Sequence, residues 1–519
     1  MRRMPGGIDL GSSSVKSVVL SARGRPGRAV RRPIGTRRRA AGRVEHDPRE
    51  ILAACVAALR GTFARRMADP SLGIATQRST VLFWDKDTGR PLTPAYSWQD
   101  LRGEPLCEAA RARQGLAERV AARTGLRLAP YYSALKLAWA LSSVKGLRRR
   151  VATGRALWGT LGTFLLWRFS GGACYAIDHA NAQRTLLFDL ETTSWDPDLF
   201  EAFGLEALLD APALPALVTT TLPAPLPLDV AVLPLRLAAM TGDQQAALIG
   251  LGCRAQGVTT INYGSGAFVL IATGERLVRV PGLLTTLLAS WRGNDPAGRA
   301  SARYAVEGPV NAAGTAIDWA IRKLRLRIRT RDLDRFLGAD DGRRRAVHFL
   351  PAIAGVGAPR WDPAAGPRFA GDLRGAAPRV LLRAVVESIA YRCAEIARAA
   401  APTVAAERGA ERAVLVAGGL TRCRTLLQAQ ADLLQRPVIV RESPDATCLG
   451  AALLTRHPGD WWSRADGWAA AGSGAEVVAP RLSRHEAEAR FLDWERAVYG
   501  AAGAGAAPFE GPPAARASR

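Results

Sequence analysis

The sequence contains very little lysine, no long apolar run and no paired cysteines. Only five of its 519 residues are lysine, and no stretch of 18 uncharged apolar residues occurs, so the sequence offers no candidate for a membrane-spanning helix. The seven cysteines and five histidines are scattered and form no C-x-x-C pair. Neither a zinc cage nor a disulfide framework is therefore expected, and a reducing cytoplasm is the predicted location.

Acidic residues are scarce relative to basic ones, and the formal net charge is +25. With so little lysine, the positive charge is almost entirely arginine, spread along the chain with short clusters at Arg37-Arg38-Arg39, Arg148-Arg149-Arg150 and Arg343-Arg344-Arg345. No stripe of basic residues interleaved with aromatic ones accompanies these clusters. The spread of arginine along the chain fits a general compositional bias better than a recognition surface. A dedicated nucleic-acid-binding protein is therefore the least favoured interpretation.

Two common nucleotide-binding motifs are also missing. The sequence has no G-x-x-x-x-G-K-[ST] loop and no G-x-G-x-x-G that opens a helix after a strand, which excludes a Walker-type loop and leaves a dinucleotide site unsupported. Instead, two glycine- and hydroxyl-rich turns stand about half the chain apart, each between apolar strand-like runs. They are Gly7-Ile8-Asp9-Leu10-Gly11-Ser12-Ser13-Ser14-Val15-Lys16 and Ile261-Asn262-Tyr263-Gly264-Ser265-Gly266-Ala267-Phe268.

Both turns suit a phosphate group, because small residues let the backbone approach a ligand closely and successive N–H groups form a concave anion site. Two shorter glycine sites follow: Gly314 at the head of an expected helix, and Gly418-Gly419 after the apolar run Ala413 to Val416. Each site alone is more simply explained as an ordinary turn. Their order along the chain predicts two related domains that hold one phosphate chain from both sides, as in a nucleotide-dependent phosphotransferase.

Two aspartates stand where phosphoryl transfer needs a metal ligand and a base near the acceptor hydroxyl. Asp9 ends an apolar strand and is a candidate for hydrated Mg2+, which binds through one or two carboxylates and keeps several waters; capping of its own turn explains it equally well. Asp243 precedes an expected helix, so an N-cap is its default role. A cap and a general base for a substrate hydroxyl are compatible roles.

Alternating strand and helix patterns organise the rest of the chain. The expected elements include a hairpin over Gly6 to Leu20, a helix opened by Asp47-Pro48 and running through Leu59, an extended connection over 211–235, and helices over Val306 to Leu324 and Val380 to Ala399. A chain of this length is too long for one core. We predict an N-terminal domain of residues 1–252, a C-terminal domain of residues 253–500 and a disordered tail of residues 501–519.

Eleven ordered segments between about Gly6 and Tyr499 carry a resemblance to a known family. Among them are Ser97-Trp98-Gln99, Asn181-Ala182-Gln183-Arg184-Thr185, Gly242-Asp243-Gln244-Gln245-Ala246-Ala247, Val306-Glu307-Gly308 and Ala358-Pro359-Arg360-Trp361-Asp362-Pro363. On these segments the chain resembles the FGGY carbohydrate kinases, and within that family it is most similar to the glycerol kinases. The resemblance implies an α/β fold of two ribonuclease-H/actin-like ATPase domains with an active-site cleft between them.

The resemblance also implies roles for particular residues. Asp243 matches the family's catalytic base. The residues that match the acceptor pocket are Arg78, Trp98, Tyr131, Gln244 and Phe268, with Ser79 at an adjoining position. The residues that match nucleotide contacts are Ser12, Ser13, Ser14, Lys16, Ser265, Gly266, Gly314 and Gly419, and Asp318 and Cys423 stand at two further expected nucleotide positions. Taken singly, Trp98, Tyr131 and Phe268 are more simply explained as core aromatic residues.

Four positions depart from the family pattern. Ser79 stands where glycerol kinases have a glutamate that accepts a hydrogen bond from a substrate hydroxyl, and a shorter, uncharged side chain leaves room for a different acceptor. Gly162 replaces a usual aspartate. Asp318 replaces a glutamine and Cys423 an asparagine, both near the expected adenine pocket.

The sequence therefore predicts an ATP- and Mg2+-dependent kinase for a small polyol or sugar, with glycerol as the first candidate acceptor and Asp243 as general base. One alternative keeps this chemistry but changes the acceptor to a ketose such as xylulose or to a longer polyol. Another is a nucleotide-binding homologue whose catalysis is impaired. No membrane or dedicated nucleic-acid partner is expected, and the oligomeric state stays open.

Overall fold

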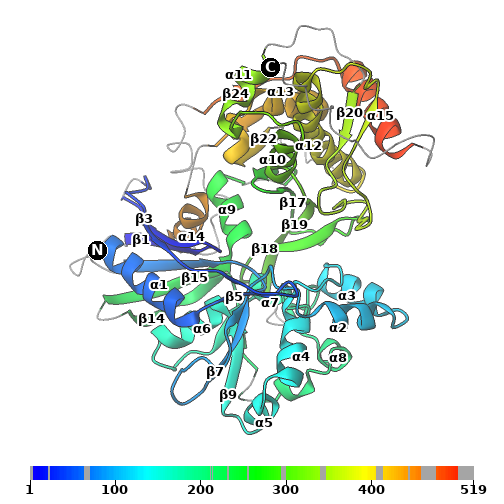
Figure 1. Cartoon of the computed structure of the whole chain (residues 1–519). Coiled ribbons are helices and arrows are strands. Elements are labelled where there is room, and N and C mark those ends of the chain that lie inside the picture. The colour runs from blue at the N-terminus through cyan, green and yellow to red at the C-terminus, as the bar shows by residue number, and fades with distance from the viewer. Residues whose placement is uncertain are drawn as a thin grey trace, which may run out of the picture.

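The computed structural model describes residues 4–21, 24–63, 70–210, 212, 214–230, 233–253, 256–293, 300–338, 347–404, 413–441, 445–456 and 475–500. The chain folds into two α/β domains, one above the other in Figure 1, each built around a large mixed sheet. Residues before Gly252 make up most of the lower domain, and residues after it most of the upper one. The predicted disordered tail, residues 501–519, lies outside the described residues.

The main sheet of the lower domain has six strands in the order β14-β15-β6-β1-β2-β3. The expected hairpin is confirmed, since β1 pairs antiparallel with β2, and β1, β6 and β15 run parallel. Leu10, Thr76 and Gly242 lie in register at the carboxyl ends of these three strands, where open α/β sheets place their ligands. The strands are β1 (Met4–Leu10), β2 (Ser14–Val19), β3 (Val30–Pro33), β6 (Pro70–Thr76), β14 (Thr221–Val230) and β15 (Leu233–Gly242).

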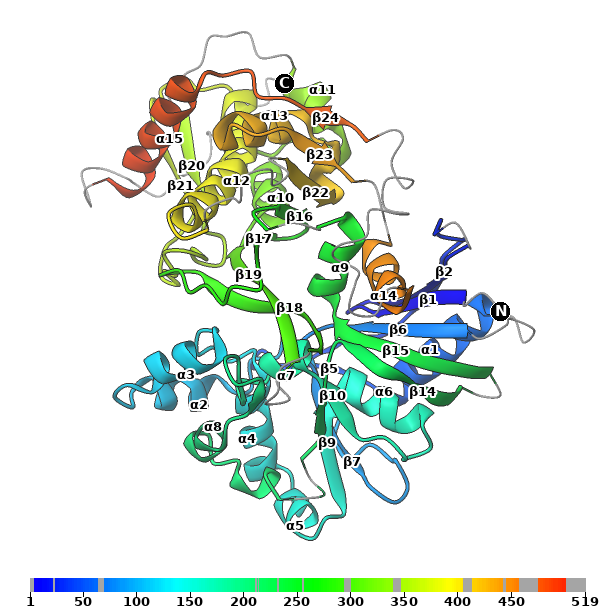
Figure 2. The same cartoon turned by 180° about the vertical axis from the view of Figure 1, so that it is seen from behind.

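A second sheet, in the order β4-β5-β8-β7-β9, continues the lower domain, with helices around it (Figure 2). Its strands are β4 (Arg37–Arg38), β5 (Val44–His46), β7 (Val81–Asp85), β8 (Ala95–Tyr96) and β9 (Ala156–Thr160), and two small pairs join β10 (Ala176–Asp178) to β13 (Ala216–Val218) and β11 (Phe188–Asp189) to β12 (Ser194–Trp195). The helices are α1 (Pro48–Thr62), α2 (Glu104–Arg111), α3 (Leu116–Thr124), α4 (Ser133–Ser143), α5 (Leu147–Ala152), α6 (Leu161–Phe169), α7 (His179–Gln183) and α8 (Pro197–Ala202).

The upper domain repeats the central arrangement of the lower one. Its sheet has the order β18-β19-β17-β16-β22-β23-β24, in which β16 and β17 form an antiparallel hairpin and β22 runs parallel to β16, as β6 does to β1. The strands are β16 (Thr259–Tyr263), β17 (Ala267–Gly274), β18 (Leu284–Arg292), β19 (Ala300–Val310), β22 (Val414–Gly418), β23 (Val438–Val440) and β24 (Val477–Val478), with β20 (Val347–Leu350) and β21 (Arg368–Gly371) paired separately. The helices are α10 (Gly314–Lys323), α11 (Leu333–Leu337), α12 (Pro378–Ala400), α13 (Arg424–Leu434) and α15 (Arg484–Tyr499).

Two predicted elements are wrong. The helix expected over Val306 to Leu324 is a strand up to Val310 and a helix only from Gly314, because the apolar residues of the first part are buried within a sheet. The connection expected over 211–235 is largely sheet, since β14 and β15 pair antiparallel there. Prolines at alternate positions of β14, Pro223 to Pro227, are tolerated at the edge of the sheet.

One helix from the C-terminal part of the sequence lies in the lower domain. Helix α14 (Ala446–Arg456) packs against β1, β6 and α9 (Asp243–Leu251), as both Figure 1 and Figure 2 show. The approach is so close that a Cβ atom added at Gly450 would lie far inside the van der Waals distance of the Ala246 carbonyl oxygen. A Cβ atom at Gly7 or Gly73 would likewise overlap the backbone of α14. Glycine is therefore required for this contact.

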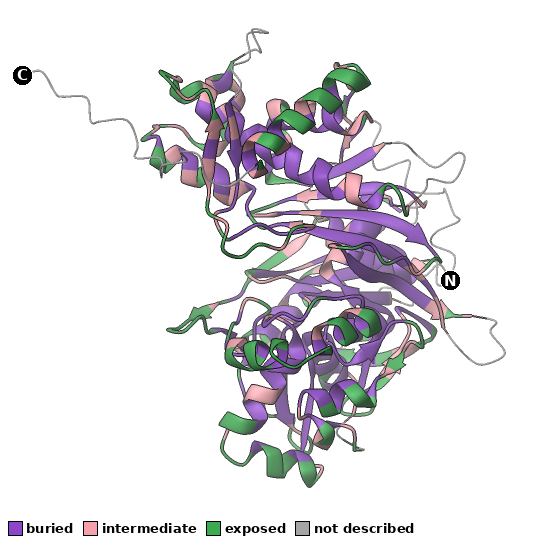
Figure 3. Cartoon of the chain, turned by 90° about the vertical axis from the view of Figure 1, so that its right-hand side faces the viewer, coloured by how far each residue is buried: buried purple, intermediate pink, exposed green. Residues whose placement is uncertain are grey.

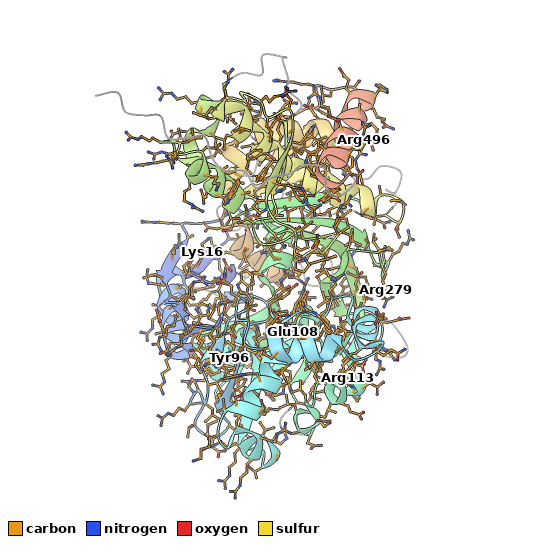
Figure 4. All side chains as sticks on the ribbon, turned by 45° about the vertical axis from the view of Figure 1, so that its right-hand side comes forward. Lys16, Tyr96, Glu108, Arg113, Arg279 and Arg496 are labelled. Atoms are coloured by element: carbon orange, nitrogen blue, oxygen red, sulfur yellow. The ribbon has the colours of Figure 1, made fainter. Side chains whose placement is uncertain are left out.

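A second junction between the domains is formed by strand β18. Gln183 donates to the carbonyl oxygens of Thr124 at 2.8 Å and Thr285 at 2.6 Å, and it accepts the N–H of Leu287 at 2.9 Å. Arg279 donates to Ala122 O at 2.6 Å. Figure 4 labels Arg279 at middle height, on the right-hand side of that view.

Burial follows the layers of the fold. In Figure 3 the central strands are mostly buried, and exposed residues concentrate on the outer helices. Among the described residues, the largest apolar cluster fills the upper domain, and two others lie on either side of β7 and β9 in the lower domain. In the described part of the chain, no helix has the length and apolar character needed to cross a membrane.

Candidate active site

The first glycine-rich turn connects β1 to β2 and is held tightly in place. Gly11 donates its N–H to Ser14 O at 3.1 Å. The carbonyl oxygens of Ser12 and Ser13 accept from the Thr36 hydroxyl and the Ile34 N–H, both at 3.1 Å. Ser13 is exposed, Ser12 is half-buried and Ser14 is buried, so the turn presents Ser12 and Ser13 outward while Ser14 anchors it.

Asp9 and Lys16 face each other across the hairpin in register, and a second carboxylate lies beside them. Lys16 Nζ is 3.7 Å from Asp445 Oδ1, at the start of α14. Asp9 is only 8% exposed. Burial, reinforced by Asp243 and Asp445 and opposed by Lys16, raises the pKa of Asp9 to about 7.

The donor set around Asp9 fits a hydrated Mg2+ ion, because neighbouring carboxylates raise the pKa of Asp9 and a cation placed among them would favour its ionised form. Among the residues that the structure describes, no group of three His, Cys, Asp or Glu side chains forms a metal cage. An ion that keeps most of its waters and binds phosphate oxygens needs no such cage.

Asp243 begins α9, and a charged network joins it to the upper domain. The helix starts one residue earlier than predicted, with Gly242 as the N-cap residue, and Asp243 Oδ1 accepts the Gln244 N–H at 2.8 Å. Arg78 Nε lies 3.6 Å from Asp243 Oδ1, and the same guanidinium donates to both oxygens of Glu307, at 3.3 and 3.2 Å. Burial raises the pKa of Asp243, although Arg78 opposes this.

Glu307 is the centre of this network. It lies on β19, is 2% exposed, and is held by Arg78 and also by Arg184, which contacts Thr286 as well. Burial raises the pKa of Glu307, but the two guanidinium groups outweigh it, and the pKa falls to about 2. Glu307 is therefore ionised at neutral pH, and it fixes the Arg78 side chain next to Asp243.

Two of the turns that carry predicted acceptor residues are held together by one lysine. Ser79 follows Arg78 in a left-handed conformation, with φ of 62°, and donates its hydroxyl to Arg184 O at 3.2 Å. Lys136, on α4, is fully buried and donates to Ser79 O at 2.6 Å and Ser97 O at 2.9 Å. Burial lowers the pKa of Lys136 to about 7.

The aromatic residues of the predicted pocket differ in their surroundings. Trp98 is 38% exposed, which makes a simple core role untenable for it. Tyr131 is half-buried with its ring centroid 4.6 Å from that of Tyr132, and burial raises its pKa. Gln244 is half-buried on α9 beside Asp243, whereas Phe268 on β17 packs against an apolar cluster that includes Leu270. Phe268 therefore has a packing role, whatever else it does.

The second glycine-rich turn is docked on the first turn of α10. Gly264 O accepts the Gly314 N–H at 3.0 Å, and Ser265 O accepts the Thr315 N–H at 3.1 Å. A Cβ atom at Gly314 would lie 2.9 Å from Gly264 O, and one at Gly266 would lie 2.6 Å from Val310 O. Both glycines are therefore needed for this close approach.

The remaining nucleotide candidates lie in the same domain. Gly418 ends β22 with φ of 104°. Gly419 is exposed, and a Cβ atom added there would meet no other atom within 4 Å. Cys423 is buried, and its thiol contacts Asp334 Oδ1 at 3.6 Å. Burial, reinforced by Asp334, raises the pKa of Cys423 to about 12. Asp318 is exposed and accepts the Thr330 hydroxyl at 3.3 Å.

The departure at Gly162 lies beside an apolar side chain. Gly162 is in α6, and a Cβ atom there would lie 3.1 Å from the Met240 methyl group. An aspartate at this position would put a charge into an apolar contact.

Four residues of the site were missed by sequence reasoning. They are Lys136, Arg184, Glu307 and Asp445, and each acts through a partner far away in the chain. The available signal was a charged residue inside an apolar run, as in Leu135-Lys136-Leu137 and Val306-Glu307-Gly308. Such a residue is rarely buried without a partner, but the sequence does not say which partner.

The fold and these paired phosphate-type turns define a two-domain α/β ATPase of the actin-like class. Comparison with known sequences agrees. Residues 4–250 match the N-terminal domain, and residues 259–457 the C-terminal domain, of the FGGY family of carbohydrate kinases. A glycerol kinase of Thermus brockianus is 38% identical, with 96% of this chain and 98% of the relative covered. One of Alkalilimnicola ehrlichii is 37% identical, with the same coverage.

Solved structures give the same result. A Plasmodium falciparum glycerol kinase crystallised with ADP superposes with a TM-score of 0.84 at 25% identity, covering 95% of this chain and 97% of that one. A ligand-bound xylulose kinase of Lactobacillus acidophilus has a TM-score of 0.79 at 19% identity, with the same coverage, and shows the fold alone. The chain belongs to the FGGY family of carbohydrate kinases and is an ATP-dependent kinase that phosphorylates an alcohol group. The predicted family, fold class and reaction type are confirmed.

Proposed function

We propose that this kinase phosphorylates a hydroxyl group of a small polyol, with glycerol as the first candidate acceptor and Asp243 as general base. The observation that carries the proposal is the position of Asp243. Its carboxylate lies beside Arg78 of the predicted acceptor turn and is close enough to Asp9, at the phosphate turn, to raise the pKa of that group. A base between an acceptor site and a phosphate site is what transfer to an alcohol requires. The identity to several glycerol kinases over the full chain supports the choice of glycerol.

In this proposal the residues of the chain mainly position the reactants. Asp243 accepts the proton of the acceptor hydroxyl as that oxygen approaches the terminal phosphorus, and its raised pKa favours proton acceptance. Arg78, fixed by Glu307, orients this carboxylate and can donate to the acceptor. The Gly11–Ser14 turn and the Gly264–Gly266 turn hold the phosphates through backbone N–H and hydroxyl groups. Asp9 would hold Mg2+ through water, and such an ion would supply positive charge against the phosphates.

Ser79 is the reason to consider a second class of acceptor. Its hydroxyl is bonded to Arg184 O and its backbone carbonyl to Lys136, so it offers little to a substrate where glycerol kinases use a carboxylate. A longer polyol or a ketose such as xylulose has further hydroxyl groups that need other partners.

The acceptor is tested by measuring ATP consumption with purified protein over a panel of glycerol, longer polyols and ketoses. The proposal expects the highest kcat/KM with glycerol. Turnover of a ketose or a longer polyol without turnover of glycerol would replace the first candidate with the second. No turnover with any member would reject the proposed function.

Lys136→Met is expected to weaken acceptor binding and to leave nucleotide binding nearly unchanged. The variant keeps the volume of the side chain but leaves the carbonyl oxygens of Ser79 and Ser97 without their common donor. Because the turns that carry Arg78 and Trp98 then lose their fixed spacing, we expect the acceptor KM to rise by about tenfold, or about 1.4 kcal/mol, which is the order of the net contribution of a hydrogen bond. Steady-state kinetics should show an ATP KM within twofold of the parent, and equal changes in both KM values would contradict this.

The affinity for Mg2+·ATP is expected to rise with pH between about pH 6 and 8. Asp9 binds a cation only when it is ionised, and its pKa of about 7 in the free protein means that ionisation is completed within this interval. Calorimetry with a non-hydrolysable ATP analogue and Mg2+ measures the effect without turnover. The titration of the nucleotide itself is removed by comparison with Asp9→Asn, which should show weaker binding and a flatter pH profile. Parallel pH profiles for the two proteins would exclude Asp9 as the metal ligand.

A further inference from the structure

A hydrogen bond joins the predicted acceptor site to the predicted phosphate turn. The indole Nε1 of Trp98 lies 2.9 Å from the hydroxyl oxygen of Ser12. Trp98 comes from the segment that follows β8, whereas Ser12 lies 86 residues earlier, between β1 and β2. Trp98 is nevertheless more than a third exposed, so this contact is not a by-product of burying an aromatic ring.

The direction of this hydrogen bond is fixed by chemistry. An indole N–H can only donate, whereas a hydroxyl can accept and donate at once. Ser12 Oγ therefore accepts from Trp98, and its own hydrogen is left to point away from the indole. A hydroxyl that donates to a charged phosphate oxygen forms a stronger bond than one between neutral groups.

The same two residues are also connected through the protein interior. Gln77 Nε2 donates to Gly11 O at 3.4 Å, the Thr80 hydroxyl donates to Gln77 Oε1 at 3.0 Å, and the Trp98 backbone N–H donates to Thr80 Oγ1 at 3.1 Å. With the bond from Trp98 to Ser12, these contacts close a ring that runs through three separate turns. Gln77 and Thr80 are fully buried, and a closed ring resists the movement of any one member.

We propose that Trp98 is a positioning residue for phosphoryl transfer: its indole N–H orients the Ser12 hydroxyl so that the hydroxyl donates to the terminal phosphate of ATP. Trp98 thereby acts on the nucleotide as well as forming a wall of the acceptor site. This inference rests on the proposed use of the Gly11–Ser14 turn for phosphate. It predicts that Trp98 affects the preference for ATP over ADP even when no acceptor is present.

The test is a double-mutant cycle with Trp98→Phe and Ser12→Ala. Phenylalanine keeps an aromatic face but has no N–H group. Calorimetry without acceptor measures the affinities for ADP and for the β,γ-imido analogue of ATP, both with Mg2+. We expect Trp98→Phe to weaken binding of the ATP analogue by about three- to tenfold, the range for one hydrogen bond, while the ADP affinity stays within twofold. In the Ser12→Ala background, Trp98→Phe should have no further effect, since the hydroxyl through which it acts is gone.

Trp195→Phe is the matched control. It deletes an indole hydrogen bond to Pro215 O at 3.0 Å elsewhere in the lower domain, and it should change neither affinity. The inference would be overturned if Trp98→Phe weakened the binding of ADP and of the ATP analogue equally. It would also be overturned if the fold-changes in affinity caused by Trp98→Phe and Ser12→Ala simply multiplied in the double variant. These measurements use no acceptor, so a failure of the glycerol assignment leaves them interpretable. A parent protein that binds neither nucleotide would reject the proposed function instead.

Discussion

Asp243→Asn is expected to lower kcat by about 10²- to 10⁴-fold, the usual contribution of a general base. Asparagine has nearly the same shape, so the backbone contact to Gln244 and the start of α9 are kept. The amide cannot take a proton from the acceptor hydroxyl, which is why the loss falls on the chemical step. Binding of ATP should change by less than threefold, because the Gly11–Ser14 and Gly264–Gly266 turns are untouched.

Stopped-time assays at saturating ATP and acceptor measure this loss, and calorimetry measures the nucleotide affinity. Asp87→Asn is a suitable control, since Asp87 is exposed on the turn after β7, and it should keep the parental rate. A kcat for Asp243→Asn within threefold of the parent would refute the assignment of the base.

Gly450→Ala is expected to destabilise the protein by about 2–4 kcal/mol, at the upper end for overpacking of a well-filled interior. The added methyl group would overlap the carbonyl oxygen of Ala246, so α9 and α14 must move apart and lose their contact. Backbone atoms on a helix cannot rotate away as a side chain can. Since α9 carries Asp243, activity should also fall in the fraction that stays folded.

Urea unfolding followed by circular dichroism gives the change in stability. Gly366→Ala is the matched control, because a Cβ atom at Gly366 meets nothing within 4 Å, and it should be neutral to within about 0.5 kcal/mol. Stability of Gly450→Ala equal to that of the control would mean that the two helices are not in such close contact.

The parts of the fold that were predictable from sequence are those whose signals are local. The hairpin of β1 and β2 and the helix α1, capped by Asp47 through the Arg49 N–H at 2.9 Å, follow from turn and cap residues within a few positions of each other. The segment from Val306 to Val310 was not predictable, because a short apolar run fits a strand or a buried helix equally well. Its partners on β17 and β18 decide the matter.

The candidate site divides in the same way. The glycine and serine residues of both turns stand out in the sequence, because a backbone that approaches a ligand closely needs several consecutive small residues. The ionic network does not stand out, since Arg78 and Glu307 are 229 positions apart and Arg184 and Glu307 are 123 apart. Only the tertiary fold brings such groups together. The Cys423 thiol, held by Asp334, is a further example.

The position of α14 limits how this polypeptide can be dissected. A fragment that stops at residue 252 would lack the helix that covers Gly7, Gly73 and Gly250. The faces of β1, β6 and α9 that pack against α14 would then be exposed to solvent. Such a truncated product should aggregate when made alone and regain a native form only when residues 445–456 are supplied, on the same molecule or in trans. We therefore expect that residues 1–252 do not fold on their own.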